Sequence, residues 1–365
     1  MKYIDEYRDR SLVKGLSAAI EKRAEKIGKE ITLMEICGTH THVIGRFGIK
    51  NLLPENIRLV SGPGCPVCVT SIYDVDKALY LAEMKNTIFA TFGDMLRVPG
   101  TGCASLQKSR AAGADVRVIA STADCIDIAE RNTTKEVCMM GIGFETTTPM
   151  VASVVELCRK KGIKNFSVFS VHKVVPPALK TLIEDPSLNI DGFICPGHVS
   201  TIIGLSPYNV IAEAGRAAVI TGFEPVDVLE GILMILGQIV EGKREVAIQY
   251  ARGVKPQGNP RARDIINRVF CTGDADWRGL GKIPSSGLFL RDDFKAFDAL
   301  EKFDVPPIHS EEIKGCSCGD VLKGVMLPGQ CSLFRKTCTP TNPIGPCMVS
   351  SEGTCAAHYK YHLDS

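Results

Sequence analysis

The segment Ile57-Arg58-Leu59-Val60-Ser61-Gly62-Pro63-Gly64-Cys65-Pro66-Val67-Cys68-Val69 runs from an apolar stretch into a glycine-rich turn that carries two cysteines. The apolar part predicts a buried β-strand, so Cys65 and Cys68 follow the carboxyl end of this strand at the start of a helix. Helix N-terminal amides favour a thiolate, and the pKa of a cysteine is easily lowered in this position. Such a pair can cycle between dithiol and disulfide, bind a soft metal, or be two unused core thiols.

Apolar runs rich in β-formers alternate with helical patterns on both sides of this segment, after an amphipathic helix at about 11–29. The first series of expected strands is 31–36, 57–60, 88–92 and 116–120, and the second is 137–142, 166–171, 190–195 and 218–221. The main helices between them are expected at 72–85, 104–112, 149–161, 177–184 and 226–241. This alternation predicts βαβ units. We expect two small parallel-sheet α/β domains of Rossmann-like type, residues 1–134 and 135–242, that face each other across a cleft.

Reactive residue types gather directly after the predicted strands. Besides the two-cysteine turn, the motifs are Cys37-Gly38-Thr39-His40, Gly143-Phe144-Glu145-Thr146-Thr147 and Pro196-Gly197-His198-Val199-Ser200. Ligands bind outside the carboxyl ends of the strands in open α/β sheets, so we expect the active site in the cleft. Each motif also has a plainer interpretation: a packed cysteine with a capping threonine, a helix cap or phosphate site before Pro149, and a polar turn residue at His198.

Residues 243–365 form the third expected domain, a loop-rich one. It carries six cysteines within 40 residues, namely Cys316, Cys318, Cys331, Cys338, Cys347 and Cys355. With many Gly and Pro residues it cannot form much core, and we expect bound metal to organise it. The wide C-x14-C-x6-C-x16-C spacing of the first, third, fourth and sixth cysteines suits a [4Fe-4S] cluster better than a zinc ribbon. Cys318 and Cys347 remain free to form a disulfide, and could pass electrons to Cys65 and Cys68.

Composition narrows the class of protein. The chain has 365 residues, of which 45% are hydrophobic and 23% charged, and its 43 basic and 41 acidic residues give a net charge of +2. Without a basic run, nucleic acid is not an expected partner. No apolar segment reaches the roughly 18–20 residues of a membrane span, and the charged N-terminus does not resemble a signal peptide. Fifteen cysteines in such a chain indicate metal binding or thiol chemistry in the cytoplasm.

Taken together, these motifs and the ending Gly345-Pro346-Cys347-Met348-Val349-Ser350-Ser351-Glu352-Gly353-Thr354-Cys355 resemble the hydrogenase maturation factor HypD family. The resemblance implies a scaffold on which the Fe(CN)2CO centre of [NiFe] hydrogenases is assembled before transfer to the large subunit. In this family a small chaperone, HypC, docks on the scaffold, and HypE with HypF supplies cyanide.

The resemblance also implies roles for particular residues. Cys37 would bind iron together with the N-terminal cysteine of the chaperone, and Cys65 and Cys68 would be the redox-active pair beside that iron. His40, Glu145 and His198 would orient ligands or move protons. Two further sets belong to the tail: the [4Fe-4S] ligands Cys316, Cys331, Cys338 and Cys355, and the disulfide relay Cys318 with Cys347.

Two other functions remain open from the residues alone. A thiol–disulfide reductase would use a cluster to reduce Cys65 and Cys68 for a protein client and would hold no iron at these thiols. A structural zinc protein would use the tail cysteines only to fold a partner-binding surface. The first alternative predicts turnover of a disulfide substrate, and the second predicts a colourless protein that accepts no electrons.

Overall fold

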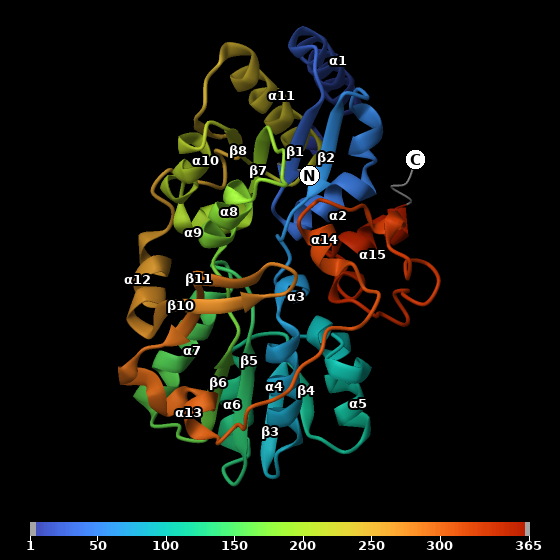
Figure 1. Cartoon of the computed structure of the whole chain (residues 1–365). Helices are drawn as coiled ribbons and strands as arrows, with labels where there is room; N and C mark the ends of the chain where they lie inside the picture. The colour runs from blue at the N-terminus through green and yellow to red at the C-terminus, as the bar shows by residue number, and fades with distance from the viewer. Residues whose placement is uncertain (1–4, 362–365) are drawn as a thin grey trace.

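The computed structural model of the chain describes residues 5–361, which form two α/β lobes with the C-terminal segment packed beside both (Figure 1). No helix among these residues is both long enough and apolar enough to cross a membrane. The local boundaries follow ordinary capping chemistry. The first long helix, α1 (Arg10–Ile27), begins after Asp9, whose carboxylate accepts hydrogen bonds from the amides of Ser11 and Leu12, and ends at Gly28 with a φ of 66°.

The first lobe contains a parallel sheet in the order β2-β1-β7-β8-β9. Its strands are β1 (Ile31–Glu35), β2 (Ile57–Ser61), β7 (Gly192–Pro196), β8 (Ala217–Thr221) and β9 (Val246–Ile248). Helices α1 and α11 (Pro225–Glu241) pack against each other and share a hydrophobic cluster with strand residues such as Leu33 and Val219. The remaining main helices of this lobe are α2 (Gly38–Arg46), α8 (Val175–Glu184), α9 (Gly197–Ile203) and α10 (Asn209–Glu213).

The second lobe contains a parallel sheet in the order β4-β3-β5-β6. Its strands are β3 (Thr87–Thr91), β4 (Val116–Val118), β5 (Glu136–Gly141) and β6 (Phe166–Ser170). Its helices are α4 (Ile72–Glu83), α5 (Leu106–Ala111), α6 (Asp124–Arg131) and α7 (Thr148–Lys161), joined by α12 (Pro260–Val269), which packs on α7. The predicted fold class, parallel-sheet α/β with a loop-rich C-terminal region, is confirmed.

The predicted grouping of strands is wrong, because the lobes are not the continuous halves 1–134 and 135–242. β1 pairs with β7, with Leu33 opposite Gly192, so the chain leaves the first lobe after β2 and returns to it after β6. Hydrophobic periodicity locates a buried strand but does not identify its neighbour in the sheet. The two crossings between lobes follow Ser61 and Ser170, and the two-cysteine turn lies on the first of them.

Residues 243–365 are also not one separate domain. β9 extends the first sheet, and α12 contributes Ile266 and Val269 to the core of the second lobe. A hairpin of β10 (Phe270–Trp277) and β11 (Gly281–Leu290) links the lobes through bridges from Trp277 to Thr70 and from Gly287 to Lys173. The loop-rich segment begins after α13 (Ala299–Lys302) and includes α14 (Cys318–Leu322) and α15 (Thr354–Tyr361).

Candidate thiol and metal site

Cys37 and the two-cysteine turn lie at the carboxyl ends of the paired strands β1 and β2, and their backbones touch. The amide of Gly38 donates to the carbonyl of Gly64 at 3.0 Å, and a Cβ on Gly64 would lie 2.2 Å from the nitrogen of Cys37. Cys65 is the residue before the short helix α3 (Pro66–Val69), and its sulfur accepts the Cys68 amide at 3.3 Å. The structure therefore brings together three buried free thiols, as the sequence predicts.

Burial dominates the acidity of these thiols. It raises the pKa of Cys37 to about 12, assisted by the charge of Glu352 and opposed by the amides of His40 and Thr39 at the start of α2. Burial also raises the pKa of Cys68 well above its ordinary value, with the neighbouring Cys65 adding to the effect. For these two thiols, the expectation that helix amides lower the pKa does not hold, because desolvation outweighs them. A cation that binds here displaces the proton.

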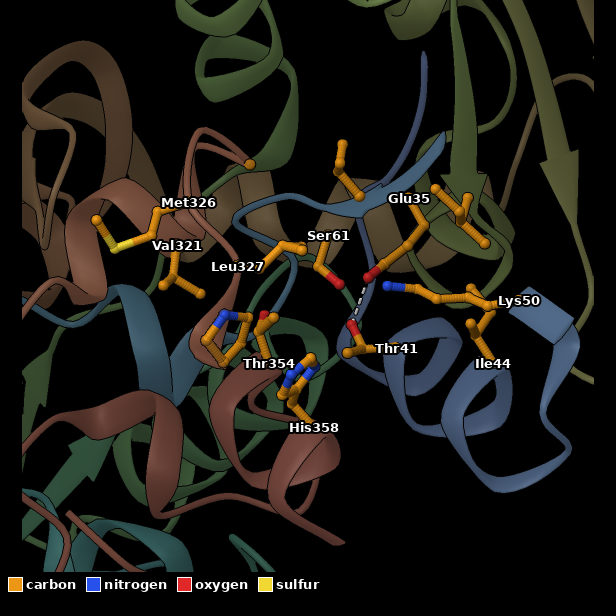
Figure 2. A pocket seen from close by; sticks show the side chains of 14 residues that line it. Glu35, Thr41, Ile44, Lys50, Ser61, Val321, Met326, Leu327, Thr354 and His358 are labelled. Atoms are coloured by element: carbon orange, nitrogen blue, oxygen red, sulfur yellow. Dashed lines mark hydrogen bonds between the residues drawn. The ribbon is translucent and has the colours of Figure 1, made fainter. Parts of the chain in front are cut away.

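Glu35 anchors the Cys37 turn, and sequence reasoning did not single it out. Its side chain is 1% exposed, and its two carboxylate oxygens accept the Cys37 amide at 3.0 Å and the Thr41 hydroxyl. Desolvation raises the pKa of Glu35 to about 7. Figure 2 shows Lys50 with its amine directed toward Glu35, beside a cavity of about 20 Å³ that His358 of α15 also lines. A cavity of this size has room for about one water molecule.

The C-terminal segment covers the Cys37 turn. A Cβ on Gly38 would lie 2.7 Å from the Cβ of Glu352, and the Thr39 hydroxyl donates to Glu352 at 2.7 Å. Cys355 lies near enough to Cys68 for the two thiols to interact electrostatically. One of the tail cysteines therefore adjoins the two-cysteine turn, although 287 residues separate them in sequence (355 − 68).

His40 and His198 are linked through the ring of Phe223. The two imidazoles stack on Phe223, with ring centroids at 4.8 Å and 3.8 Å respectively. His40 is buried, and its Nε2 donates to the carbonyl of Gly222 at 2.9 Å, with Thr221 Oγ1 also at 2.9 Å. Its Nδ1 has no partner among the described residues, and desolvation lowers its pKa to about 4. His198 is exposed, so the pair runs from solvent to the buried end of α2.

Glu145 follows β5 in the second lobe, and its hydrogen bond runs to α8. Oε1 accepts the amide of Val175 at 3.0 Å, and Oε2 has no partner within residues 5–361. The next two residues, Pro176 and Pro177, have no amide hydrogen, so Glu145 caps the remaining donor at the start of this helix. Desolvation raises the pKa of Glu145 to about 7. Its clearest role in the structure is to fix the second crossing between the lobes.

Glu145→Gln is expected to stabilise the protein at pH 8 and to change little at pH 4.5. The raised pKa means that the folded state holds the proton more tightly, so stability present below pH 4.5 is lost as the pH rises to about 7. The amide keeps an acceptor for Val175, and the gain at pH 8 is at most about 3 kcal/mol from the shift. Urea unfolding at both pH values tests this, with the exposed Glu213→Gln as control. An equal response of both variants at pH 8 would refute it.

Four tail cysteines form the candidate cluster site. Cys355 interacts electrostatically with Cys338, Cys316 and Cys331, so the four sulfurs share one neighbourhood. Cys331 has its pKa lowered because hydrogen bonds from the Ser317 and Leu333 amides outweigh the opposing effect of burial. A Cβ on Gly345 would lie 2.6 Å from the sulfur of Cys316, so this glycine leaves space beside the ligand.

These residues fit a [4Fe-4S] cluster in number and chemistry. Among residues 5–361, no three His, Cys, Asp or Glu side chains converge closely enough to hold a single metal ion. In a cubane each cysteine binds a different iron, so its four sulfurs need not converge on one point. Phe334, Met348 and Tyr359 surround Cys338 and Cys355 with apolar side chains, which limits the access of water.

Cys318 and Cys347 form a disulfide with a Cα–Cα separation of 6.5 Å. The pairing implied by the family resemblance is therefore present, while its redox role stays a prediction. Both residues are buried in the same hydrophobic cluster as Cys65 and Cys68, and Cys316 and Cys355 pack against it. Thiols of the tail and of the two-cysteine turn thus meet in one core.

Comparison with known proteins agrees with this arrangement. The HypD family model, described as the hydrogenase formation hypA family, matches residues 11–362. Hydrogenase maturation factor HypD2 of Bradyrhizobium diazoefficiens is 46% identical over 99% of this chain and 97% of its own length. HypD of Cupriavidus necator is 44% identical over 99% and 97%, and HypD of Rhodobacter capsulatus is 46% identical over 99% and 98%. The chain belongs to the HypD family of hydrogenase maturation factors.

Proposed function

We propose that the chain is the scaffold and redox protein on which the Fe(CN)2CO centre of a [NiFe] hydrogenase is assembled. It holds iron together with a HypC-type chaperone, accepts cyanide from a HypE-type partner served by HypF, and delivers the centre toward the hydrogenase large subunit. The carrying observation is the backbone contact between the Cys37 turn and the two-cysteine turn, which gathers three buried free thiols under the tail.

Cys37 is the proposed iron ligand from this chain. It occupies the position before α2, yet its sulfur makes no capping hydrogen bond within the described residues, so its lone pairs are available. Low-spin ferrous iron carrying cyanide is a soft centre that suits thiolate. Glu35 and Glu352 lie near enough to raise the pKa of the thiol, and the same negative charges stabilise a bound cation.

Cys65 and Cys68 are the proposed electron source beside this iron. When the two thiols close to a disulfide, they release two electrons and two protons. Cys316, Cys331, Cys338 and Cys355 would hold the cluster, which supplies one-electron transfer when bound. The Cys318–Cys347 disulfide is the proposed relay, and His40 with His198 is proposed to orient ligands or to move protons. A cytoplasmic location belongs to this proposal, because the thiols must stay reduced.

Mössbauer spectroscopy of iron-57-labelled protein tests the proposal. The protein is prepared without oxygen, both alone and with its HypC-type partner. We expect a cubane signal in both samples and an additional low-spin ferrous signal with the partner. A cubane signal alone in both samples would favour the thiol–disulfide reductase, and zinc without iron would favour the structural zinc protein.

A further inference from the structure

The turn of the β10–β11 hairpin is wedged between the two-cysteine turn and the tail. The amide of Arg278 donates to the carbonyl of Val69 at 2.9 Å, directly after Cys68. On the other side, a Cβ on Gly279 would lie 2.3 Å from the Cα of Gly319, which directly follows Cys318. Residues 278 and 279 therefore contact the backbones that carry the candidate dithiol and the disulfide.

Arg278 brings a buried positive charge to this place. The residue is 4% exposed, and a guanidinium stays charged at any physiological pH. Its Nη1 donates to the carbonyl of Pro99 at 3.3 Å, and its Nε and Nη2 donate to Glu312 at 3.1 and 2.9 Å. The Glu312 side chain is 58% exposed, so water screens the negative partner more than the buried guanidinium.

The same ion pair holds the chain that leads into the first cluster cysteine. Glu312 is followed by Ile313, whose carbonyl accepts the amide of Cys316 at 3.2 Å. Arg278 also acts on Cys316 electrostatically: burial raises the pKa of this thiol, and the Arg278 charge opposes the increase. The guanidinium thus lies within electrostatic range of a candidate cluster ligand while its backbone contacts the two-cysteine turn.

We propose that Arg278 is a positioning residue that sets the reduction potential of the cluster held by Cys316, Cys331, Cys338 and Cys355. This inference rests on the proposed function, since it assumes that these cysteines hold a [4Fe-4S] cluster. Reduction adds negative charge to the cluster, and a buried cation nearby stabilises the added charge. Arg278 therefore raises the potential and holds the turn against the backbone that carries the dithiol.

Potentiometric titration of the anaerobic full-length protein, followed by electron paramagnetic resonance, tests this. Arg278→Gln is expected to shift the midpoint potential of the cluster to more negative values, and Arg278→Lys, which keeps the charge, to shift it less. Glu312→Gln removes the opposing carboxylate and is expected to shift the potential to more positive values. Arg110→Gln, an exposed arginine on α5, is the control and should leave the potential unchanged.

The opposite signs separate an electrostatic role from a merely structural one. If Arg278→Gln holds its cluster at the wild-type potential, the inference is wrong while the proposed function stands. If Arg278→Gln loses its cluster, Glu312→Gln decides, and an unchanged or more negative potential there overturns the inference. A wild-type protein without a cubane signal would overturn the proposed function and this inference together, and iron analysis reports that outcome separately.

Discussion

Replacing Cys37 with serine is expected to remove the low-spin ferrous iron from the protein while leaving the fold and the cluster in place. A serine hydroxyl is a harder and less acidic donor than a thiol, so it is a poor ligand for soft low-spin iron. Cys37 is the residue before α2 and has an extended backbone with a φ of −153°. Serine is favoured in such a position, so α2 should be as stable as in the wild type or more stable by up to about 1 kcal/mol.

The measurement is Mössbauer spectroscopy of the iron-57-labelled complex with the HypC-type partner, alongside thermal unfolding. The matched control is Cys271→Ser, which replaces a half-buried free thiol in β10 and should keep both iron signals. If Cys37→Ser retains the low-spin signal and Cys65→Ser loses it, the iron is held by the two-cysteine turn instead. Loss of the cubane signal in Cys37→Ser would contradict the separation of the two sites.

The positions of the strands follow from the sequence, whereas their pairing does not. β5 is predicted at 137–142 and found at Glu136–Gly141, because fully buried strands are continuous apolar runs. The partner of β1 on its second edge is β7, about 160 residues later, and no property of either run identifies the other. The β10–β11 hairpin was missed because its strands are rich in Gly, Ser and Asp and pack mainly through Trp277 and its neighbours.

The candidate site divides in the same way. Cys37 and Cys65 are predictable neighbours because each ends a parallel strand, and β1 and β2 pair up to Glu35 opposite Ser61. Glu35 had a usable signal, since it is a charged residue in an otherwise apolar strand directly before the cysteine motif. Glu352 had none, because its contact with Thr39 spans 313 residues. Arg278 was invisible for the same reason: tertiary packing brings it beside residues distant in the sequence.

Gly64→Ala is expected to be among the most damaging single methyl additions in the chain. The new Cβ would lie 2.2 Å from the nitrogen of Cys37 and 2.3 Å from the carbonyl carbon of Ile36. These are backbone atoms, and they cannot move freely because the amide of Ile36 donates to Ile194 and that of Gly38 donates to Gly64. Overpacking of this kind costs about 1–3 kcal/mol or more, and relief requires the two cysteine turns to separate.

Gly15→Ala is the matched control, because it makes the same substitution where the methyl group meets nothing. Gly15 lies on the exposed face of α1 with no atom within 4 Å of the new Cβ, and alanine there should stabilise by about 0.5–1 kcal/mol. Urea unfolding and iron content of both variants are the measurements. We expect opposite signs of the change in stability and loss of low-spin iron only in Gly64→Ala. Equal stabilities would mean that the two turns can part without cost, and the contact that carries the proposed function would lose its importance.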